Sequence, residues 1–204
     1  MTEKKVKSKF DQYNEFFSIK YPFSINITPL SNEQVSSYES FSQAMPIAFK
    51  MASDIEEINQ SSHQKTTSSS DFPAKLTEVL NLQSQKIDLL MDFILSQEDD
   101  KTRRFKGLSF GGGGLSFESR TAFELEQFLE IKLFMLHRHC AIFCYAQVIE
   151  STIKNKEPEK YEHKVVFHFI RDSDRESLVR FSLKEQSKQL QHLANERSNS
   201  NPSS

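Results

Sequence analysis

All five glycines of this 204-residue chain lie in one short window, between Gly107 and Gly114. Tight turns and close backbone approaches require glycine, so such backbone freedom is concentrated in this window. The apolar residues follow different periods on its two sides. Ahead of it they recur mostly at spacings of three and four, which is typical of helices. From Arg103 onward they alternate with polar residues, which is typical of strands.

Six short stretches have the pattern of β-strands. They cover residues 18–28, 103–110, 115–119, 129–135, 142–148 and 165–169. Short strands at this spacing predict an antiparallel barrel or sandwich. A helix over residues 172–194 and a disordered polar tail over residues 195–204 are expected to follow. The predicted fold class is therefore α+β, mainly β.

A helical region is predicted between the first two strands. Ser31 or Asn32 can cap its first helix, and Pro46 is expected to kink or split that helix. Residues 59–70 are polar and rich in serine and threonine, which predicts a flexible loop. The chain thus divides into an N-terminal segment with the first strand (1–30), an inserted helical region (31–98), a barrel with its closing helix (99–194) and the tail (195–204).

The second predicted helix, which follows Pro73, carries a heptad pattern. Its apolar positions alternate strictly at spacings of four and three over about three heptads, as in the seam of a coiled coil. Two interpretations are open. The helix packs only on its own barrel and on the first helix, or it also joins copies of the chain, with Gln83 limiting the register. The seam positions predicted to mediate oligomerisation are Leu76, Leu80, Gln83, Ile87, Leu90 and Ile94.

The composition argues against several classes of protein. A formal net charge of −2 is unlike that of a surface that binds nucleic acid polymers. The first residues lead into no apolar signal segment, and no apolar run reaches the roughly 18 residues of a transmembrane helix. Two cysteines without a CxxC motif suit a reducing compartment. We therefore expect a cytoplasmic protein without membrane insertion.

The sequence predicts neither a catalytic site nor a metal site. No Ser/His/Asp or Cys/His arrangement has a recognisable local signature. His137, His139, Cys140 and Cys144 form the best metal candidate. On one strand, however, the two cysteines would stand about 13 Å apart, too far to bind one ion. We therefore expect no enzymatic activity, no metal and no cofactor.

The run Gly111–Gly114 is the strongest candidate for a ligand site, because the exposed N–H groups of a glycine-rich turn can hold a phosphate. The run differs from a Walker A loop, since no GK[ST] follows it. It differs from a GxGxxG turn, since residues 115–117 continue as a strand. The alternative is a mobile hairpin loop without a ligand.

The strand, the Ser/Gly-rich turn and the following Leu-Ser-Phe-Glu-Ser of residues 115–119 resemble the nucleotide-binding turn of PilZ domains, which are bacterial receptors for cyclic di-GMP. The resemblance covers about residues 103–192. The first half, with strand-forming Tyr21–Leu30 and the helical residues 85–90, is similar to an atypical PilZ subgroup in which inserted helices assemble a tetramer. The resemblance implies a six-stranded antiparallel β-barrel with a C-terminal helix, and an inserted long helical pair that forms a coiled-coil-like oligomer seam.

PilZ domains that bind cyclic di-GMP share RxxxR before the first barrel strand and [DN]xSxxG at the turn. No arginine precedes Arg103 in this chain, and Lys20 is a poor geometric substitute for a guanidinium. Neither alignment of the turn, with the motif serine at Ser109 or at Gly111, restores the second motif. The residues that remain for a ligand are Arg103, Arg104, Ser109, Gly111, Gly112, Gly113 and Gly114, with an ordinary solvated strand edge as the alternative for the two arginines.

The resemblance implies two alternative functions. The first is a non-catalytic oligomeric adaptor in cyclic di-GMP signalling, with a degenerate nucleotide site and a protein partner. The second is a genuine cyclic di-GMP receptor that binds through the modified turn and through Arg103 and Arg104. Nucleotide titration and the mass of the protein in solution distinguish the two.

Overall fold

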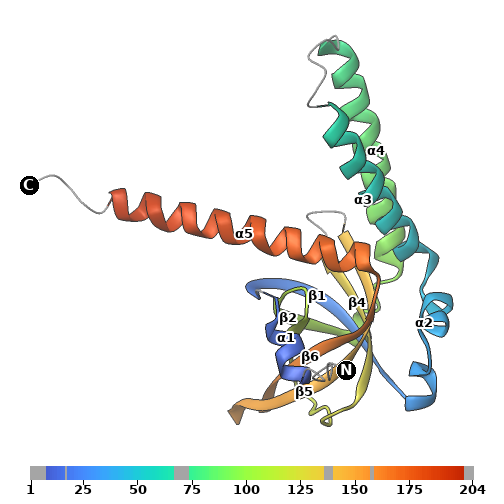
Figure 1. Ribbon diagram of the computed structural model, residues 1–204, viewed down its shortest axis with the longest axis vertical. Coiled ribbons are helices and arrows are strands. Elements are labelled where there is room, and N and C mark those ends of the chain that lie inside the picture. The colour runs from blue at the N-terminus through green and yellow to red at the C-terminus, as the bar shows by residue number, and fades with distance from the viewer. Residues whose placement is uncertain (1–7, 17, 67–73, 136–139, 157–158, 200–204) are drawn as a thin grey trace, which may run out of the picture.

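The structure is a computed structural model that describes residues 8–16, 18–66, 74–135, 140–156 and 159–199 (Figure 1). Its centre is a closed barrel with the strand order β1-β2-β3-β6-β5-β4, and all its neighbouring strands are antiparallel. The six-stranded antiparallel barrel that the resemblance implies is confirmed. The strands are β1 (Ile19–Leu30), β2 (Arg104–Phe110), β3 (Gly114–Ser119), β4 (Phe128–Met135), β5 (Cys140–Lys156) and β6 (Glu159–Ile170), and the helices are α1 (Lys9–Asn14), α2 (Tyr38–Ala44), α3 (Ile47–Thr66), α4 (Ala74–Gln97) and α5 (Asp172–Asn199).

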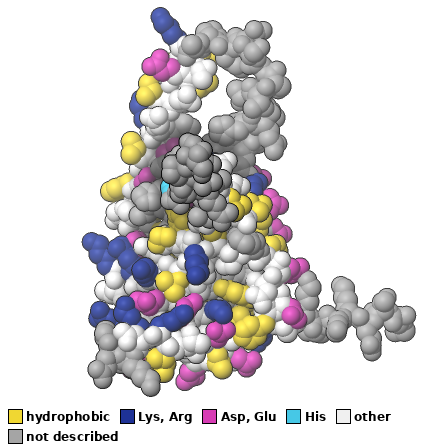
Figure 2. Space-filling model, turned by 90° about the vertical axis from the view of Figure 1, so that its left-hand side faces the viewer, with side chains coloured by type: hydrophobic (Ala, Val, Ile, Leu, Met, Phe, Trp, Pro, Cys, Tyr) yellow, Lys and Arg dark blue, Asp and Glu magenta, His cyan; other side chains and the backbone are white. Residues whose placement is uncertain are grey.

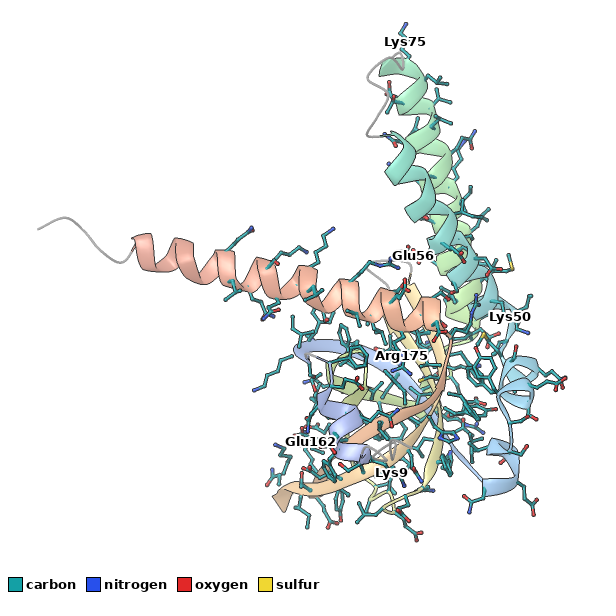
Figure 3. The ribbon with its side chains drawn as sticks, in the orientation of Figure 1. Lys9, Lys50, Glu56, Lys75, Glu162 and Arg175 are labelled. Atoms are coloured by element: carbon teal, nitrogen blue, oxygen red, sulfur yellow. The ribbon has the colours of Figure 1, made fainter. Side chains whose placement is uncertain are left out.

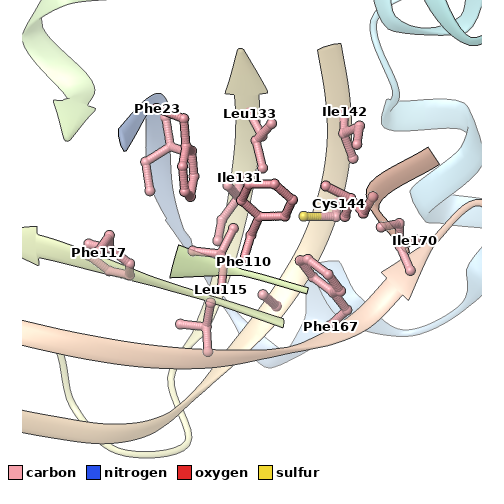
Figure 4. Packing of buried hydrophobic residues seen from close by; sticks show 14 of the residues in the cluster. Phe23, Phe110, Leu115, Phe117, Ile131, Leu133, Ile142, Cys144, Phe167 and Ile170 are labelled. Atoms are coloured by element: carbon pink, nitrogen blue, oxygen red, sulfur yellow. The ribbon is translucent and has the colours of Figure 1, made fainter. Parts of the chain in front are cut away.

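Phenylalanine and aliphatic side chains fill the barrel. In Figure 4, Phe110, Phe167, Ile131 and Leu133 point into the space between the strands, and all four are buried. The interior of a barrel with this few strands is narrow enough for side chains to fill it. Burial in this core also raises the pKa of the Cys144 thiol, which makes it a poor nucleophile.

The outer face of β4 and β5 is covered as well. Phe41 of α2 stacks on Phe143 of β5 with 5.6 Å between ring centroids, and its ring lies 5.1 Å from that of Tyr145. Met91 and Leu95 of α4 belong to the same buried cluster. Around Phe134 and Phe143 these two strands are therefore buried on both faces, and a second apolar layer holds the helical region against the barrel.

Helices α3 and α4 form a hairpin that stands away from the barrel (Figure 1). Pro46 separates α3 from α2, as the sequence predicts, because proline removes a helical hydrogen bond and clashes with the preceding turn. Among the described α4 side chains, those of Met91 and Leu95 are the buried ones. Figure 3 shows Lys75 at the opposite end of the hairpin, far from the barrel.

Two helices run further than the sequence predicts. Helix α3 continues to Thr66, through much of the stretch predicted to be a loop from residue 59. Helix α5 continues to Asn199, past its predicted end at residue 194 and into the predicted tail. Neither extension contains a glycine or a proline. Polar composition alone is therefore a weak signal for the end of a helix.

Helix α5 lies across one end of the barrel, where Leu178 is buried, and its first turns contact α3. The Ser53 hydroxyl of α3 donates a hydrogen bond to the buried Asp174 carboxylate, with 2.7 Å between Oγ and Oδ1. Arg171 forms an ion pair with Asp54 at 3.2 Å. Burial raises the pKa of Asp174 to about 6, although the Ser53 hydrogen bond acts in the opposite direction. These contacts link the base of the hairpin to α5.

Replacing Phe41 by alanine tests the outer apolar layer. Phe41 is fully buried, so Phe41→Ala should lower the free energy of unfolding by about 3–5 kcal/mol. Urea denaturation followed by circular dichroism measures the loss. The control Ile47→Ala removes an apolar side chain that is 68% exposed and should cost less than about 1 kcal/mol. Equal losses in the two variants would contradict the described packing.

The pH dependence of stability tests the environment of Asp174. The folded chain binds this proton near pH 6, whereas the ordinary pKa of the group is 3.8. Acidification from pH 7.5 to 5 therefore stabilises the folded state through Asp174. The neutral variant Asp174→Asn should be more stable than the parent at pH 7.5, and this advantage should shrink by roughly 1–2 kcal/mol at pH 5.

Urea unfolding of both proteins at the two pH values gives the difference. Burial lowers the pKa of His163, which acts with the opposite sign, but His163 is present in both proteins and cancels. The exposed Asp172 provides the control Asp172→Asn. An advantage of Asp174→Asn that is the same at both pH values would show that Asp174 does not titrate in this range.

Candidate functional site

The glycine-rich turn between β2 and β3 is buried. All four residues of Gly111–Gly114 are buried. The Gly111 N–H donates to the Gly114 carbonyl oxygen at 2.9 Å, and the Phe167 N–H donates to the Gly113 carbonyl oxygen at 3.0 Å. The turn is thus packed and hydrogen-bonded to β6, which fits neither a mobile hairpin loop nor a phosphate cradle open to solvent.

These glycines provide space rather than unusual backbone angles, because none of the chain's glycines has a positive φ. A Cβ atom on Gly113 would overlap the carbonyl oxygen of Gln12 and lie 2.7 Å from that of Tyr13, and both acceptors belong to α1. A Cβ on Gly114 would instead overlap the carbonyl oxygen of Val165 in the neighbouring strand β6. The turn therefore lacks side chains because α1 on one side and the barrel on the other leave no room.

Helix α1 covers the turn from outside the barrel (Figure 1). Its first residue is capped by Ser8, which exchanges hydrogen bonds with Asp11 in a capping box. The Gln12 amide donates to the carbonyl oxygen of Phe167 at 3.4 Å. Burial raises the pKa of the Tyr13 phenol, and a hydrogen bond with Ser109 opposes this shift. Helix α1 was not predicted, although Ser8-Lys9-Phe10-Asp11 has the pattern of a helix start.

Arg175 of α5 contacts the turn from a second direction. Its guanidinium donates a hydrogen bond to the Gly112 carbonyl oxygen and lies 5.9 Å from the centre of the Phe16 ring. Figure 3 shows Arg175 where α5 passes over the barrel. Nothing in the local sequence around Arg175 indicates a contact with residue 112, so this contact could not be predicted.

Arg103 and Arg104 lie at the opposite end of β2 from the glycine turn. Arg104 is the first residue of β2 and Phe110 the last, which separates them by about 20 Å at the usual rise of a strand. Arg104 forms an ion pair with Asp99, and Arg103 forms one with Asp100 at 3.5 Å. The predicted ligand set is therefore not brought together, because the extended strand holds its two parts apart.

A small cavity of about 100 Å³ lies beside Arg103. The side chains that line this cavity include acidic and basic groups. Burial raises the pKa of one of them, Glu130. Mixed charge of this kind indicates an ion-pair network rather than a phosphate site. The lining residues are Asn26, Thr28, Glu98, Asp100, Arg103, Glu130 and Lys132.

Beside the turn, the half-buried Ser109 and the buried Ser116 lie between two lysines. Lys20 of β1 pairs in register with Ser109, and Ser116 pairs with Lys164 of β6. The hydroxyl oxygens of Ser109 and Ser116 are 2.6 Å apart, and Lys164 forms an ion pair with Glu150 at 3.0 Å. Figure 2 shows basic and acidic side chains interleaved over the lower part of the molecule. This surface is balanced in charge rather than strongly basic.

The predicted oligomerisation positions lie together on α4 and are largely exposed. The exposed fractions are 42% for Leu76, 57% for Leu80, 49% for Ile87 and 64% for Leu90. Gln83 is exposed too, while Ile94 is half-buried where the helix meets the barrel. Four more large apolar side chains of the same helix are exposed: Val79, Leu82, Leu89 and Phe93. We call these eight exposed apolar residues the α4 stripe.

The described part of the chain holds no group of three or more His, Cys, Asp or Glu side chains arranged to bind a metal ion. His137 and His139 lie outside the described residues, and the side chain of Cys140 is not described either. Within the same described ranges, each helix is too short or too polar to cross a bilayer.

Comparison with known proteins places this geometry in context. A model of the PilZ domain family matches residues 83–184, which is half of the chain. No curated protein matches the sequence. A solved structure of a pathogenic protein from Xanthomonas campestris, described as a tetrameric PilZ domain self-assembled via an unusual helical bundle, is 12% identical with a TM-score of 0.55, and the match covers 87% of this chain and 94% of that one. At this identity the likeness shows a shared fold.

Two further structures match over shorter regions. The inhibitor of motility MotI/DgrA from Bacillus subtilis is 15% identical with a TM-score of 0.38, and the match covers 42% of each chain. The PilZ domain of YcgR from Escherichia coli, solved with c-di-GMP, is 16% identical with a TM-score of 0.34, and the match covers 48% of this chain and 79% of that one. The aligned part of this chain thus spans about two-fifths of the B. subtilis protein.

Alanine at neighbouring glycines should have different effects. Gly113→Ala should push α1 away but leave the barrel folded, because the atoms that its Cβ meets belong to α1. Gly114→Ala should cost about 3 kcal/mol or more, because its Cβ meets the β6 backbone. Urea denaturation and hydrogen exchange of residues 8–16 measure the two effects. Equal destabilisation by the two variants would contradict this assignment.

Proposed function

The chain belongs to the PilZ domain family, and on this basis we propose that it is a non-catalytic adaptor in bacterial cyclic di-GMP signalling that works as an oligomer assembled through α4. The observation that carries this proposal is the α4 stripe. Its side chains stand on a helix that projects beyond the barrel, where a second copy can reach them.

The energetics of the α4 stripe favour association. Burying one large aliphatic side chain stabilises by about 1.5–3 kcal/mol when the side chain starts fully exposed. Large exposed apolar patches are rare on soluble monomers and usually mark an interface. Four residues of the stripe, Leu76, Leu80, Ile87 and Leu90, have the spacing of a coiled-coil seam, so the proposed partner is α4 of another copy. Polar Gln83 within the seam favours one register.

We take the oligomer to be a tetramer. The Xanthomonas campestris structure is described as a tetramer self-assembled via a helical bundle, and a hairpin of two helices on a barrel provides the parts for such a bundle. The α3 residue Ile58, which is 62% exposed, adds apolar surface to the same hairpin. We place this assembly in the cytoplasm, with a protein as its downstream partner.

The nucleotide site is degenerate in this proposal. The glycine turn is buried under α1, and the arginines of β2 are paired with Asp99 and Asp100 at the other end of the strand. No arginine precedes Arg103 to supply the RxxxR motif of nucleotide-binding PilZ domains. These features disfavour the alternative, a receptor that binds cyclic di-GMP through Arg103 and Arg104.

Charge in the α4 stripe should dissociate the oligomer. The wild-type chain of 23.7 kDa should give several times this mass by light scattering at micromolar concentration. Ile87→Asp combined with Leu90→Asp should give the monomer mass, because burying unpaired carboxylates is costly. The matched control is Leu125→Asp combined with Ile153→Asp. These two positions, in the β3–β4 loop and on β5, are similarly exposed and lie away from α4, so the oligomer should stay intact. A monomeric wild type would refute the proposal.

Calorimetry distinguishes the adaptor from the receptor. Near-millimolar cyclic di-GMP should give no binding heat with the wild-type chain, because the turn is covered. If binding does occur and Arg103→Ala or Arg104→Ala weakens it by about 1–3 kcal/mol, the size of a charged hydrogen bond, the receptor interpretation replaces the adaptor.

A further inference from the structure

We infer that the β3–β4 loop (residues 120–127) is an acid-opened lid over one end of the barrel, and that the buried imidazole of His163 is the group that takes up the proton. This inference goes beyond the proposed assembly and does not depend on it, because neither the loop nor His163 belongs to the α3–α4 hairpin. A monomeric protein would leave the lid unaffected, and failure of the lid would leave the oligomer intact.

His163 of β6 holds the start of this loop. Its Nε2 atom lies 3.0 Å from the Ser119 hydroxyl oxygen and 3.3 Å from the Thr121 carbonyl oxygen. The Ser119 hydroxyl itself donates to the Thr121 carbonyl oxygen, so toward the imidazole it can only accept. The proton of the neutral ring therefore resides on Nε2, and Nδ1 is left as the acceptor.

The Nδ1 atom of His163 has no hydrogen-bond partner. Among the residues that the structure describes, it is the one buried side-chain nitrogen or oxygen atom in this position, and His163 has no exposed surface. Aromatic rings surround it, with centroids 5.0 Å away for Phe117, 5.1 Å for Phe123 and 6.0 Å for Tyr161. A second proton would therefore place a buried charge on a nitrogen that has no acceptor, which is costly.

The charged side chains near His163 are directed elsewhere. Those that flank the inward-facing residues of β3 and β6 point outward, because successive side chains of a strand lie on opposite faces. Their ion pairs are Glu118–Lys160, Lys164–Glu150 and Glu162–Lys154. The charged residues of the loop and of the neighbouring part of β2 are exposed, namely Arg120, Glu124, Glu126 and Lys106, and the Tyr161 hydroxyl donates to Glu159. Burial accordingly has the largest effect on the pKa of His163 and lowers it, while the hydrogen bond with Thr121 acts in the opposite direction.

The loop is held by few contacts and contains a strained residue. Phe123 is half-buried, and its ring meets those of Phe105 and Phe117 with 5.9 Å and 5.7 Å between centroids. Glu126 has a φ of 67°, a left-handed conformation that is unfavourable for residues with a side chain. Two hydrogen bonds, both 2.8 Å long, join Glu126 to Gln147 and Val148 of β5. Segments with so few buried contacts open without unfolding of the whole protein.

Acid should favour the open lid. Once the loop has moved away, the imidazole meets water and titrates at its ordinary pKa of 6.5, whereas its pKa in the closed lid is lower. Above pH 6.5 the ring is neutral in both states, and the closed lid keeps its full stability. As the pH falls below 6.5, the open state binds the proton more readily and gains in population. Proton uptake would thus expose the rings of Phe105 and Phe117 at this end of the barrel.

Hydrogen exchange of residues 119–127 in the full-length chain at pH 7.5 and pH 5 measures the opening. These residues include Glu124 and Gln127, whose amides are hydrogen-bonded within the loop. After correction for the intrinsic effect of pH, wild-type exchange relative to the β4 amides should be about fivefold faster or more at pH 5. His163→Leu should abolish this pH dependence. The matched control His168→Leu removes an exposed imidazole of the same strand and should preserve it.

Proton NMR of the wild type provides a second test that needs no variant. The ring signals of His163 should titrate with a midpoint below pH 6.5, and those of Phe123 should change with the same midpoint because the two rings are in contact. A His163 midpoint at or above pH 6.5 would overturn the inference, since the closed lid would then not disfavour the proton. Equal wild-type exchange at both pH values, or a pH dependence that survives in His163→Leu, would overturn it as well.

Discussion

The architecture depends on apolar burial on both faces of β4 and β5. Their inner side chains fill the barrel, and their outer ones, such as Phe143 and Tyr145, pack against α2, α3 and the end of α4. The outer layer fixes the base of the hairpin through Met91 and Leu95 and ends there. Helix α4 therefore has one end that is anchored on the barrel and one end that is exposed. The hydrophobic effect attaches the first end to the barrel, and it favours association of the exposed end with another copy.

Much of this fold follows from local pattern. Apolar and polar residues alternate with a period of two along a half-buried strand, so the barrel strands could be predicted from the sequence. Proline interrupts a helix, so the break between α2 and α3 at Pro46 could be predicted too. The ends of α3 and α5 could not, because polar residues are compatible with helix and loop alike. Helix α1 is too short to show a period and is stabilised by tertiary contacts with the turn and β6.

The contacts at the candidate site could not be predicted from local sequence pattern. The glycine run marks a place where side chains are excluded, but the sequence does not identify what excludes them, and the structure assigns this role to α1, α5 and β6. Arg103 and Arg104 are close to the turn in sequence and far from it in space, because a strand is extended. Arg175 is far in sequence and adjacent in space. Contacts between distant segments leave no local signal.

The packing of the glycine turn also bears on how relatives of this chain are identified. In this protein selection can preserve the run for steric reasons alone, since an added methyl group meets neighbouring atoms whether or not a nucleotide is bound. In a diverged PilZ sequence, a glycine-rich turn therefore indicates a tightly covered hairpin and does not by itself indicate a second-messenger receptor.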